Sequence, residues 1–186
     1  MTRGKQVLFV QGGGDVTHDE WDDKLVDSLR SRLGPAYEVR YPRMPEDDDP
    51  SVATWIPRIR HELASLEDRA VVVGHSIGAT LLVHALESQP PDRPLGAIVL
   101  LAAPFVGRGG WEDDDFEITR ETGGRLPPGA AVHMFFGLDD NTVPPSHADL
   151  WASAIPLARV HPLPGRDHQL ANDLREVADL ISALGS

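Results

Sequence analysis

The stretch of sequence that decides the fold reads Val71-Val72-Val73-Gly74-His75-Ser76-Ile77-Gly78. Consecutive β-branched residues are typical of a strand buried on both faces. Residues 76–88, which follow, are apolar nearly all round, as in a buried helix. Glycine stands two positions before and two positions after Ser76, where a sharp strand-to-helix turn has no room for a larger side chain. The stretch therefore predicts a strand, a tight turn that exposes the Ser76 hydroxyl, and a helix.

A plainer interpretation is that Ser76 only caps the helix and that the glycines only form a turn. Short motifs of this kind also arise by chance in glycine-rich chains. Here, however, the motif lies directly between a buried strand and a buried helix, the context that a nucleophile elbow needs. The context favours Ser76 as a nucleophile, with the next amide at the positively polarised start of the helix.

Short apolar runs alternate with longer amphipathic segments on both sides of this stretch. The alternation predicts an α/β fold, a three-layer α/β/α sandwich with about six mostly parallel strands. Strands are expected at residues 7–10, 37–41, 71–73, 98–101, 132–136 and 158–163. Helices are expected at residues 19–33, 50–66, 76–88, 146–154 and 169–184, with a start or a kink at Pro57.

Residues 104–128 follow neither pattern, being rich in glycine, proline and acidic residues. The segment is too long for an ordinary connection, so we expect a short lid or a mobile loop. No linker or change of composition divides the rest of the chain. We therefore expect residues 1–186 to form a single domain.

Composition and charge exclude several classes of function. The chain has 186 residues, no cysteine and a net charge of −12. Disulfides, a thiolate nucleophile and cysteine metal sites are therefore excluded, and nucleic acid is not an expected partner. No run of apolar residues is long enough for a secretory signal or a membrane span, so we expect no membrane association and a cytoplasmic location.

Two other motifs are incomplete. His61-Glu62 lacks the second histidine of H-E-x-x-H, and no other compact set of metal ligands is visible. Gly12-x-Gly14 lacks the third glycine of the dinucleotide fingerprint, because Thr17 occupies that position. We expect neither a metal nor another cofactor, and a nucleotide-binding protein stays an alternative that uses the Gly12 loop.

The elbow at Gly74, His75, Ser76 and Gly78 resembles that of the α/β-hydrolase superfamily, and the resemblance covers nearly the whole chain. The compact size is similar to that of small, capless serine hydrolases of the retinoblastoma-binding-protein type. The resemblance implies a reduced α/β-hydrolase fold with the strand order 2-1-3-4-5-6. It also implies a triad that follows the order nucleophile, acid, histidine along the chain.

That order directs attention to two later loops. Residues 137–144 resemble the acid loop of the superfamily, G-x-x-D-x-x-V-P, which implies Asp140 as the triad acid and leaves Asp139 as an alternative. Residues 164–168, which end in His168, resemble the loop that carries the histidine. The resemblance therefore implies a triad of Ser76, Asp140 and His168, in which His168 accepts the serine proton and the acid orients it.

The expected oxyanion hole lies after the first strand, in Gln11-Gly12-Gly13-Gly14-Asp15. The superfamily often has a histidine where this chain has Gln11. The resemblance implies the backbone N–H groups of Gly13 and Ile77 as donors, but the run of glycines leaves open which amide of the loop points inward.

The implied function is a serine hydrolase that cleaves small acyl substrates through an acyl-enzyme on Ser76. Carboxylic esters come first, and thioesters and amides are alternatives, as is acyl transfer to an acceptor other than water. A binding protein that has lost catalysis on the same scaffold is a further alternative. Trp21, Phe105 and Trp111 are interpreted either as lining of an acyl pocket or as ordinary core. A small-molecule substrate is the expected partner, and the chain is expected to be a monomer or a homodimer.

Overall fold

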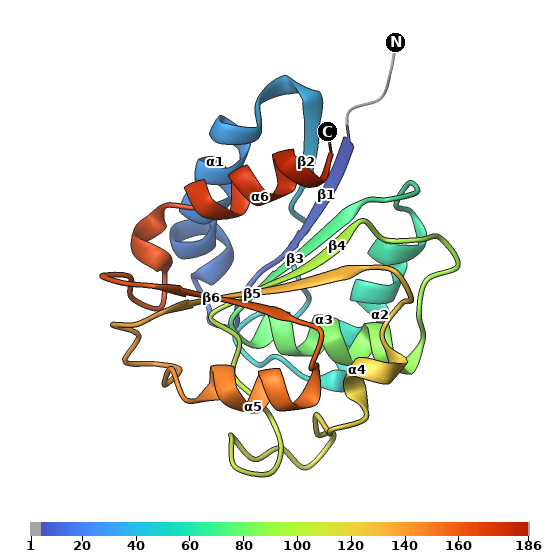
Figure 1. Cartoon of the computed structure of the whole chain (residues 1–186), viewed down its shortest axis with the longest axis vertical. Helices are drawn as coiled ribbons and strands as arrows, with labels where there is room; N and C mark the ends of the chain where they lie inside the picture. Colours follow the sequence, from blue (N-terminus) through green and yellow to red (C-terminus); the bar gives the residue numbers. More distant parts are fainter. Residues whose placement is uncertain (1–4, 186) are drawn as a thin grey trace.

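A computed structural model describes residues 5–185 of the chain. Its centre is a six-stranded sheet in the order β2-β1-β3-β4-β5-β6, in which all neighbouring strands are parallel (Figure 1). The strands are β1 (Lys5–Val10), β2 (Tyr37–Arg40), β3 (Val71–His75), β4 (Ala97–Leu101), β5 (Ala131–Gly137) and β6 (Arg159–Leu163). The predicted class and strand order are confirmed.

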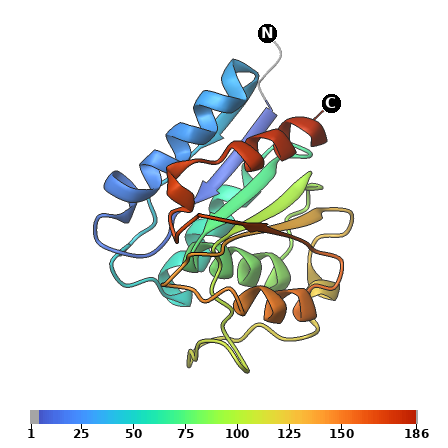
Figure 2. The same ribbon diagram turned by 60° about the vertical axis from the view of Figure 1, so that its left-hand side comes forward.

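Helices cover both faces of the sheet (Figures 1 and 2). On one face lie α1 (Asp22–Leu33) and α6 (Arg175–Leu184). The other face carries α2 (Val52–Ala64), α3 (Ile77–Ser88), α4 (Thr122–Arg125) and α5 (His147–Ala154). Within residues 5–185, none of these helices is both long and apolar enough to cross a membrane.

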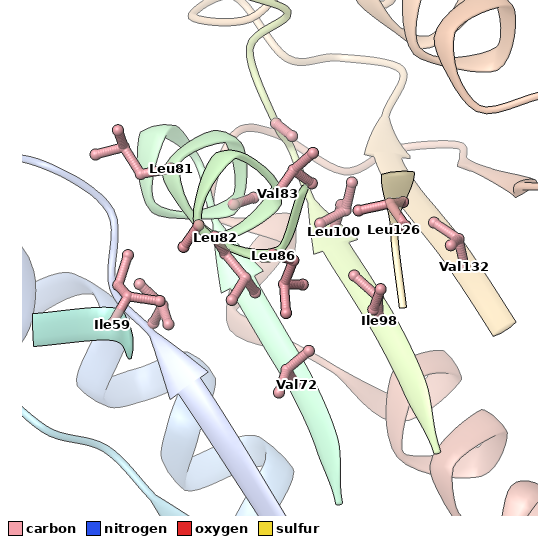
Figure 3. Close-up of a cluster of buried hydrophobic side chains, with 14 of the residues drawn as sticks. Ile59, Val72, Leu81, Leu82, Val83, Leu86, Ile98, Leu100, Leu126 and Val132 are labelled. Carbon is pink, nitrogen blue, oxygen red and sulfur yellow. The ribbon is translucent and has the colours of Figure 1, made fainter. Parts of the chain in front are cut away.

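Alternating side chains of the central strands form two separate cores. Val72, Ile98 and Leu100 face α3, where they pack with Leu82 and Leu86 (Figure 3). The intervening residues of the same strands belong to the second core, under α1 and α6. Because both faces of the central strands are covered, their sequences are continuously apolar instead of alternating. This explains why the run of valines before Gly74 predicts a strand that is buried on both faces.

The last predicted helix, residues 169–184, is wrong in its first turn. Leu170–Asn172 form a short separate turn, and α6 begins only at Arg175. Leu170, Ala171 and Asn172 have φ values of +50°, +54° and +54°, which a right-handed helix does not allow. The Asp167 side chain accepts a hydrogen bond from the Ala171 N–H at 2.8 Å and stabilises this left-handed turn.

Two other helices begin at points that the pattern misplaces. The helix expected at residues 19–33 starts at Asp22, after a wider turn formed by Thr17–Trp21. The expected start or kink at Pro57 is not where α2 begins: this helix starts at Val52 and runs through Pro57. Ser51 caps it, because its side chain accepts a hydrogen bond from the Thr54 N–H at 3.3 Å.

The segment 104–128 packs onto the same face as α3 and α5. Backbone hydrogen bonds join parts of the segment to one another: Ile118 donates to the Val106 carbonyl at 2.7 Å, and Gly107 donates to the Trp111 carbonyl at 2.9 Å. Its buried apolar side chains belong to the core under α3: Phe105, Val106, Phe116, Ile118 and Leu126. This packing supports an anchored loop; a lid function for the segment stays a prediction.

Candidate active site

Ser76 occupies the turn between β3 and α3 in a strained conformation, with φ +52° and ψ −134°. Residues other than glycine rarely adopt such a backbone, which persists only where the surroundings enforce it. Here the Ser76 N–H donates to the Leu101 carbonyl at 2.9 Å, and the Ser76 carbonyl accepts from the Ala79 N–H at 3.0 Å. The neighbouring strand and the first turn of the helix therefore hold the serine in place.

The two glycines of the elbow are required by backbone contacts. A Cβ atom at Gly74 would lie 2.5 Å from the Ala79 Cα, and one at Gly78 would lie 1.8 Å from the Gln11 carbonyl oxygen. Neither backbone neighbour can rotate away as a flexible side chain would. Glycine is therefore needed on both sides of Ser76, because the neighbouring backbone leaves no room for a side chain there.

The structure brings the three expected triad side chains together. His168 Nε2 lies 2.9 Å from Ser76 Oγ, and His168 Nδ1 lies 2.8 Å from Asp140 Oδ2. The other Asp140 oxygen accepts hydrogen bonds from the N–H groups of Thr142 at 2.7 Å and Val143 at 2.8 Å. The acid is therefore fixed by its own loop, and the histidine connects it to the nucleophile.

Asp140, and not its neighbour Asp139, contacts His168. Asp139 is exposed, and its main-chain N–H donates to the Arg166 carbonyl at 3.0 Å. Burial by itself raises the pKa of Asp140, but the hydrogen bonds from His168 and from its own loop outweigh this and hold the pKa below its ordinary value of 3.8. The carboxylate is therefore charged at neutral pH and can stabilise a protonated imidazole.

The glycine loop after β1 has one free amide next to the elbow. The Gly12 N–H donates to Asp22 Oδ2 at 2.7 Å, and the Gly14 N–H donates to the Asp47 carbonyl at 2.7 Å. The N–H groups of Gly13 and Ile77 have no acceptor among residues 5–185. A Cβ on Gly13 would lie 3.1 Å from Ile77 Cγ2, so the two residues are neighbours. The N–H groups of Gly13 and Ile77, unpaired in the described part of the chain, are the two that the resemblance implies as oxyanion donors.

Gln11 has a role that the sequence analysis did not assign. Its side chain is fully buried, and its Oε1 accepts a hydrogen bond from the Met44 N–H at 2.9 Å. Its Nε2 lies 3.4 Å from Asp47 Oδ2. Gln11 therefore ties the glycine loop to the segment that follows β2.

Sequence reasoning missed Asp22, and it placed His75 in the elbow without a chemical role. Both are buried, and the Asp22 carboxylate contacts His75 Nδ1 beside the ring of His168. The available signal was the position of Asp22, three and four residues before the buried Leu25 and Val26 on the apolar side of α1. A carboxylate on that side of a helix needs a buried partner.

The glycine loop is poorly suited to a nucleotide. Two of its three amides are used internally, and the Asp22 carboxylate occupies the Gly12 amide that a phosphate would need. Within the described part of the chain, no three histidine or acidic side chains come together as metal ligands would.

The aromatic residues that were considered as pocket lining behave differently from one another. Phe105 is buried in the core, with its ring centroid 5.4 Å from that of Trp151. Trp111 is partly exposed and lies against His147, with the ring centroids 5.9 Å apart. Trp21 is also exposed. For Phe105, core packing is the interpretation that the contacts support.

A parallel sheet in this order, with a strained serine after its central strand and a Ser-His-Asp contact, defines the α/β-hydrolase class. The family described as "Serine hydrolase" matches residues 7–171. The chain belongs to this serine hydrolase family, and its general function is that of a hydrolytic enzyme. A comparison with curated proteins finds no match.

Three solved structures illustrate the similarity of fold. The ydeN gene product from B. subtilis superimposes with a TM-score of 0.76 at 20% identity, over 97% of this chain and 98% of that one. Arabidopsis thaliana SOBER1 gives 0.70 at 14% identity, over 99% and 100% of the two chains. The Paleococcus ferrophilus monoacylglycerol lipase gives 0.66 at 16% identity, over 97% and 95%. At such identities the likeness establishes the fold.

Replacing Gly78 with alanine tests the backbone contact at the elbow. Because the new Cβ would meet the Gln11 carbonyl at 1.8 Å, we expect Gly78→Ala to lower the free energy of unfolding by about 1–3 kcal/mol or more. Gly124→Ala is the matched control, since no atom lies within 4 Å of a Cβ there. Urea denaturation measures both; equal stability of the two variants would show that the contact is not restrictive.

Replacing Asp140 with asparagine is expected to make the free energy of unfolding depend less on pH below about pH 5. Since the folded pKa of Asp140 lies below 3.8, its charge stabilises the folded state above that pH, and this contribution disappears as the pH falls through the folded pKa. Between about pH 5 and pH 3 the wild type should therefore lose more unfolding free energy than Asp140→Asn. Urea denaturation at stepped pH checks this, with the exposed Asp139→Asn as control. Parallel curves for wild type and Asp140→Asn would contradict it.

Proposed function

We propose that the protein is a carboxylesterase-like enzyme that hydrolyses small carboxylic esters through an acyl-enzyme on Ser76. The observation that carries this proposal is the unbroken hydrogen-bonded chain from Ser76 Oγ through His168 to a buried, charged Asp140. A serine hydroxyl becomes a useful nucleophile at neutral pH when a base accepts its proton and an acid orients that base.

In the first step, His168 Nε2 takes the Ser76 proton while Ser76 Oγ forms a bond to the ester carbonyl carbon. The electron pair of the carbonyl double bond moves to its oxygen, next to the free N–H groups of Gly13 and Ile77. The imidazolium that forms is stabilised by the Asp140 carboxylate, 2.8 Å from Nδ1.

In the second step, the tetrahedral intermediate collapses and His168 gives its proton to the departing alcohol oxygen. Water then takes the place of the alcohol, loses a proton to His168 and attacks the acyl carbon. Ser76 Oγ then leaves the acyl carbon and takes that proton from His168. In total, one ester and one water are consumed, and one acid and one alcohol are formed.

Two features support small, uncharged acyl substrates. The connection between β4 and β5 is longer than the one between β5 and β6. Its buried side chains nevertheless join the core under α3 and do not form a separate cap. The net charge of −12 disfavours substrates that carry several negative charges. A simple ester such as 4-nitrophenyl acetate is therefore the first substrate to test.

A fluorophosphonate probe should form one adduct, on Ser76, because only an activated serine reacts readily. Ser76→Ala should lose the adduct and lower hydrolysis of 4-nitrophenyl acetate by about 10⁴-fold or more, and His168→Ala should weaken both. Ser153→Ala is the control, since Ser153 lies exposed on α5 and its hydroxyl donates to the Asp149 carbonyl. Mass spectrometry locates the adduct.

A folded wild type that forms no adduct would contradict the proposal and favour a binding protein on a hydrolase scaffold. If the adduct forms, the products decide between hydrolysis and acyl transfer. Hydrolysis releases one equivalent of acid for each ester consumed, which a pH-stat measures directly. Less acid than ester consumed, with the acyl group on another acceptor, would indicate a transferase.

A further inference from the structure

A second histidine-aspartate pair lies directly behind the catalytic one. Asp22 and His75 are 0% and 1% exposed. His75 Nδ1 lies 2.9 Å from Asp22 Oδ1 and 3.0 Å from Asp22 Oδ2. The His75 and His168 rings are neighbours, with centroids 5.1 Å apart. The reaction described above uses neither Asp22 nor His75, although burying such a pair is costly unless its hydrogen bonds are complete.

The contacts of His75 define its protonation. Its Nε2 lies 3.0 Å from the main-chain carbonyl oxygen of His168, which can only accept a hydrogen bond. Nε2 therefore carries a hydrogen. Its Nδ1 faces a carboxylate, so a bare nitrogen there would place lone pairs against each other. The arrangement is satisfied by an imidazolium that donates from both nitrogens.

The charged groups around His75 favour this state. They are Asp22 on α1 and Asp140 in the loop after β5; the ring of His168 packs against the His75 ring. Burial lowers the pKa of His75, but the charge and hydrogen bond of Asp22, the His168 carbonyl and the charge of Asp140 outweigh it. The pKa of His75 therefore lies above its ordinary value of 6.5.

The Asp22 carboxylate also binds the glycine loop after β1. Asp22 Oδ2 accepts the Gly12 N–H at 2.7 Å, and Gly12 lies so close to the nucleophile that a Cβ on it would be 3.2 Å from the Ser76 Cβ. One chain of hydrogen bonds thus runs from the Gly12 amide through Asp22 and His75 to the His168 carbonyl. It connects the loop after β1 with the loop after β6, on either side of Ser76.

We propose that Asp22 and His75 are positioning residues for the catalytic base: they clamp the His168 main chain and the Gly12 amide in one hydrogen-bonded chain. This inference rests on the function proposed above. The remainder of the histidine loop is held from its other end, where Arg166 donates to the carbonyls of Leu170 and Asp173 at 2.6 and 2.7 Å. The His75 contact is thus the attachment at the catalytic residue itself.

His75→Phe keeps a ring of similar size and removes both donors. We expect it to lower kcat and the rate of fluorophosphonate labelling by about 10- to 100-fold, with little change in KM, since small misplacements of a base have effects of this size. The matched control is His133→Phe, a buried histidine on β5 whose Nδ1 contacts His161 instead of the active site. It should keep wild-type labelling.

A comparison of Asp22→Asn with Asp22→Leu distinguishes the effect of the hydrogen bonds from the effect of side-chain volume. Asparagine still accepts the Gly12 N–H and donates to a neutral His75, whose Nε2–H still holds the His168 carbonyl. Leucine has a similar volume but breaks both links. We expect labelling near wild type for Asp22→Asn and a loss comparable to that of His75→Phe for Asp22→Leu. Equal behaviour of the two variants, after their folding is checked by circular dichroism, would overturn the proposal.

A measurement that needs no turnover separates this inference from the proposed function. In ¹⁵N-histidine-labelled protein at neutral pH, two ring N–H protons should be observed for His75, assigned by their absence in His75→Phe. The His168 Nδ1–H proton, which bridges to Asp140, should shift in His75→Phe and not in His133→Phe. An unchanged His168 signal, or a His75 ring without an Nε2–H proton, overturns the clamp even if Ser76 is labelled. A wild type that shows the clamp but no labelling contradicts only the proposed function.

Discussion

The backbone contact between Gly78 and the carbonyl of Gln11 is the constraint on which the rest of the structure depends. The first turn of α3 lies so close to the end of β1 that a single added carbon would be 1.8 Å from that oxygen. Such an approach requires β1 and β3 to be neighbours, and they pair in parallel along residues 7–10 and 71–74. The same contact places the glycine loop beside Ser76, so one close approach brings together the strained serine and the Gly13 N–H, which is unpaired within residues 5–185.

The strands on the other side of β3 complete the site. β4 holds the nucleophile directly, because the Leu101 carbonyl accepts the Ser76 N–H. β5 and β6 follow in order, and their carboxyl ends carry the loops of Asp140 and His168. Parallel strands bring the carboxyl ends to the same edge, so residues 92 positions apart, Ser76 and His168, meet at hydrogen-bond distance. The contact of the three side chains is therefore a consequence of strand order and of loops that are each held locally.

Local patterns in the sequence were enough to predict the strands and the turn at Ser76, because each rests on an apolar run or on a short motif. The strand order and the choice of Asp140 and His168 came from the resemblance to the α/β-hydrolase superfamily, and the structure brings these two side chains into contact with Ser76. What local patterns could not predict are contacts between distant segments. Asp22 pairs with a residue 53 positions away, and nothing near it in sequence indicates that partner. The left-handed turn at Leu170–Asn172 likewise depends on Asp167 and Arg166, whose hydrogen bonds override an apolar pattern that is typical of a helix. The free amide of Gly13 became identifiable only when the acceptors of Gly12 and Gly14 were known.

The two histidine-aspartate pairs differ in burial, and that difference divides their roles. The side chain of His168 is 18% exposed, and its Nε2 contacts a hydroxyl that can both lose and regain a proton. His75 is enclosed, and its two ring nitrogens face the Asp22 carboxylate and the His168 main-chain carbonyl. An imidazole that donates a hydrogen bond from each ring nitrogen has no free lone pair with which to act as a base. It does hold two acceptors in a fixed geometry. On the proposed function, His168 therefore transfers protons, and His75, whose ring centroid lies 5.1 Å from that of His168, holds His168 in place.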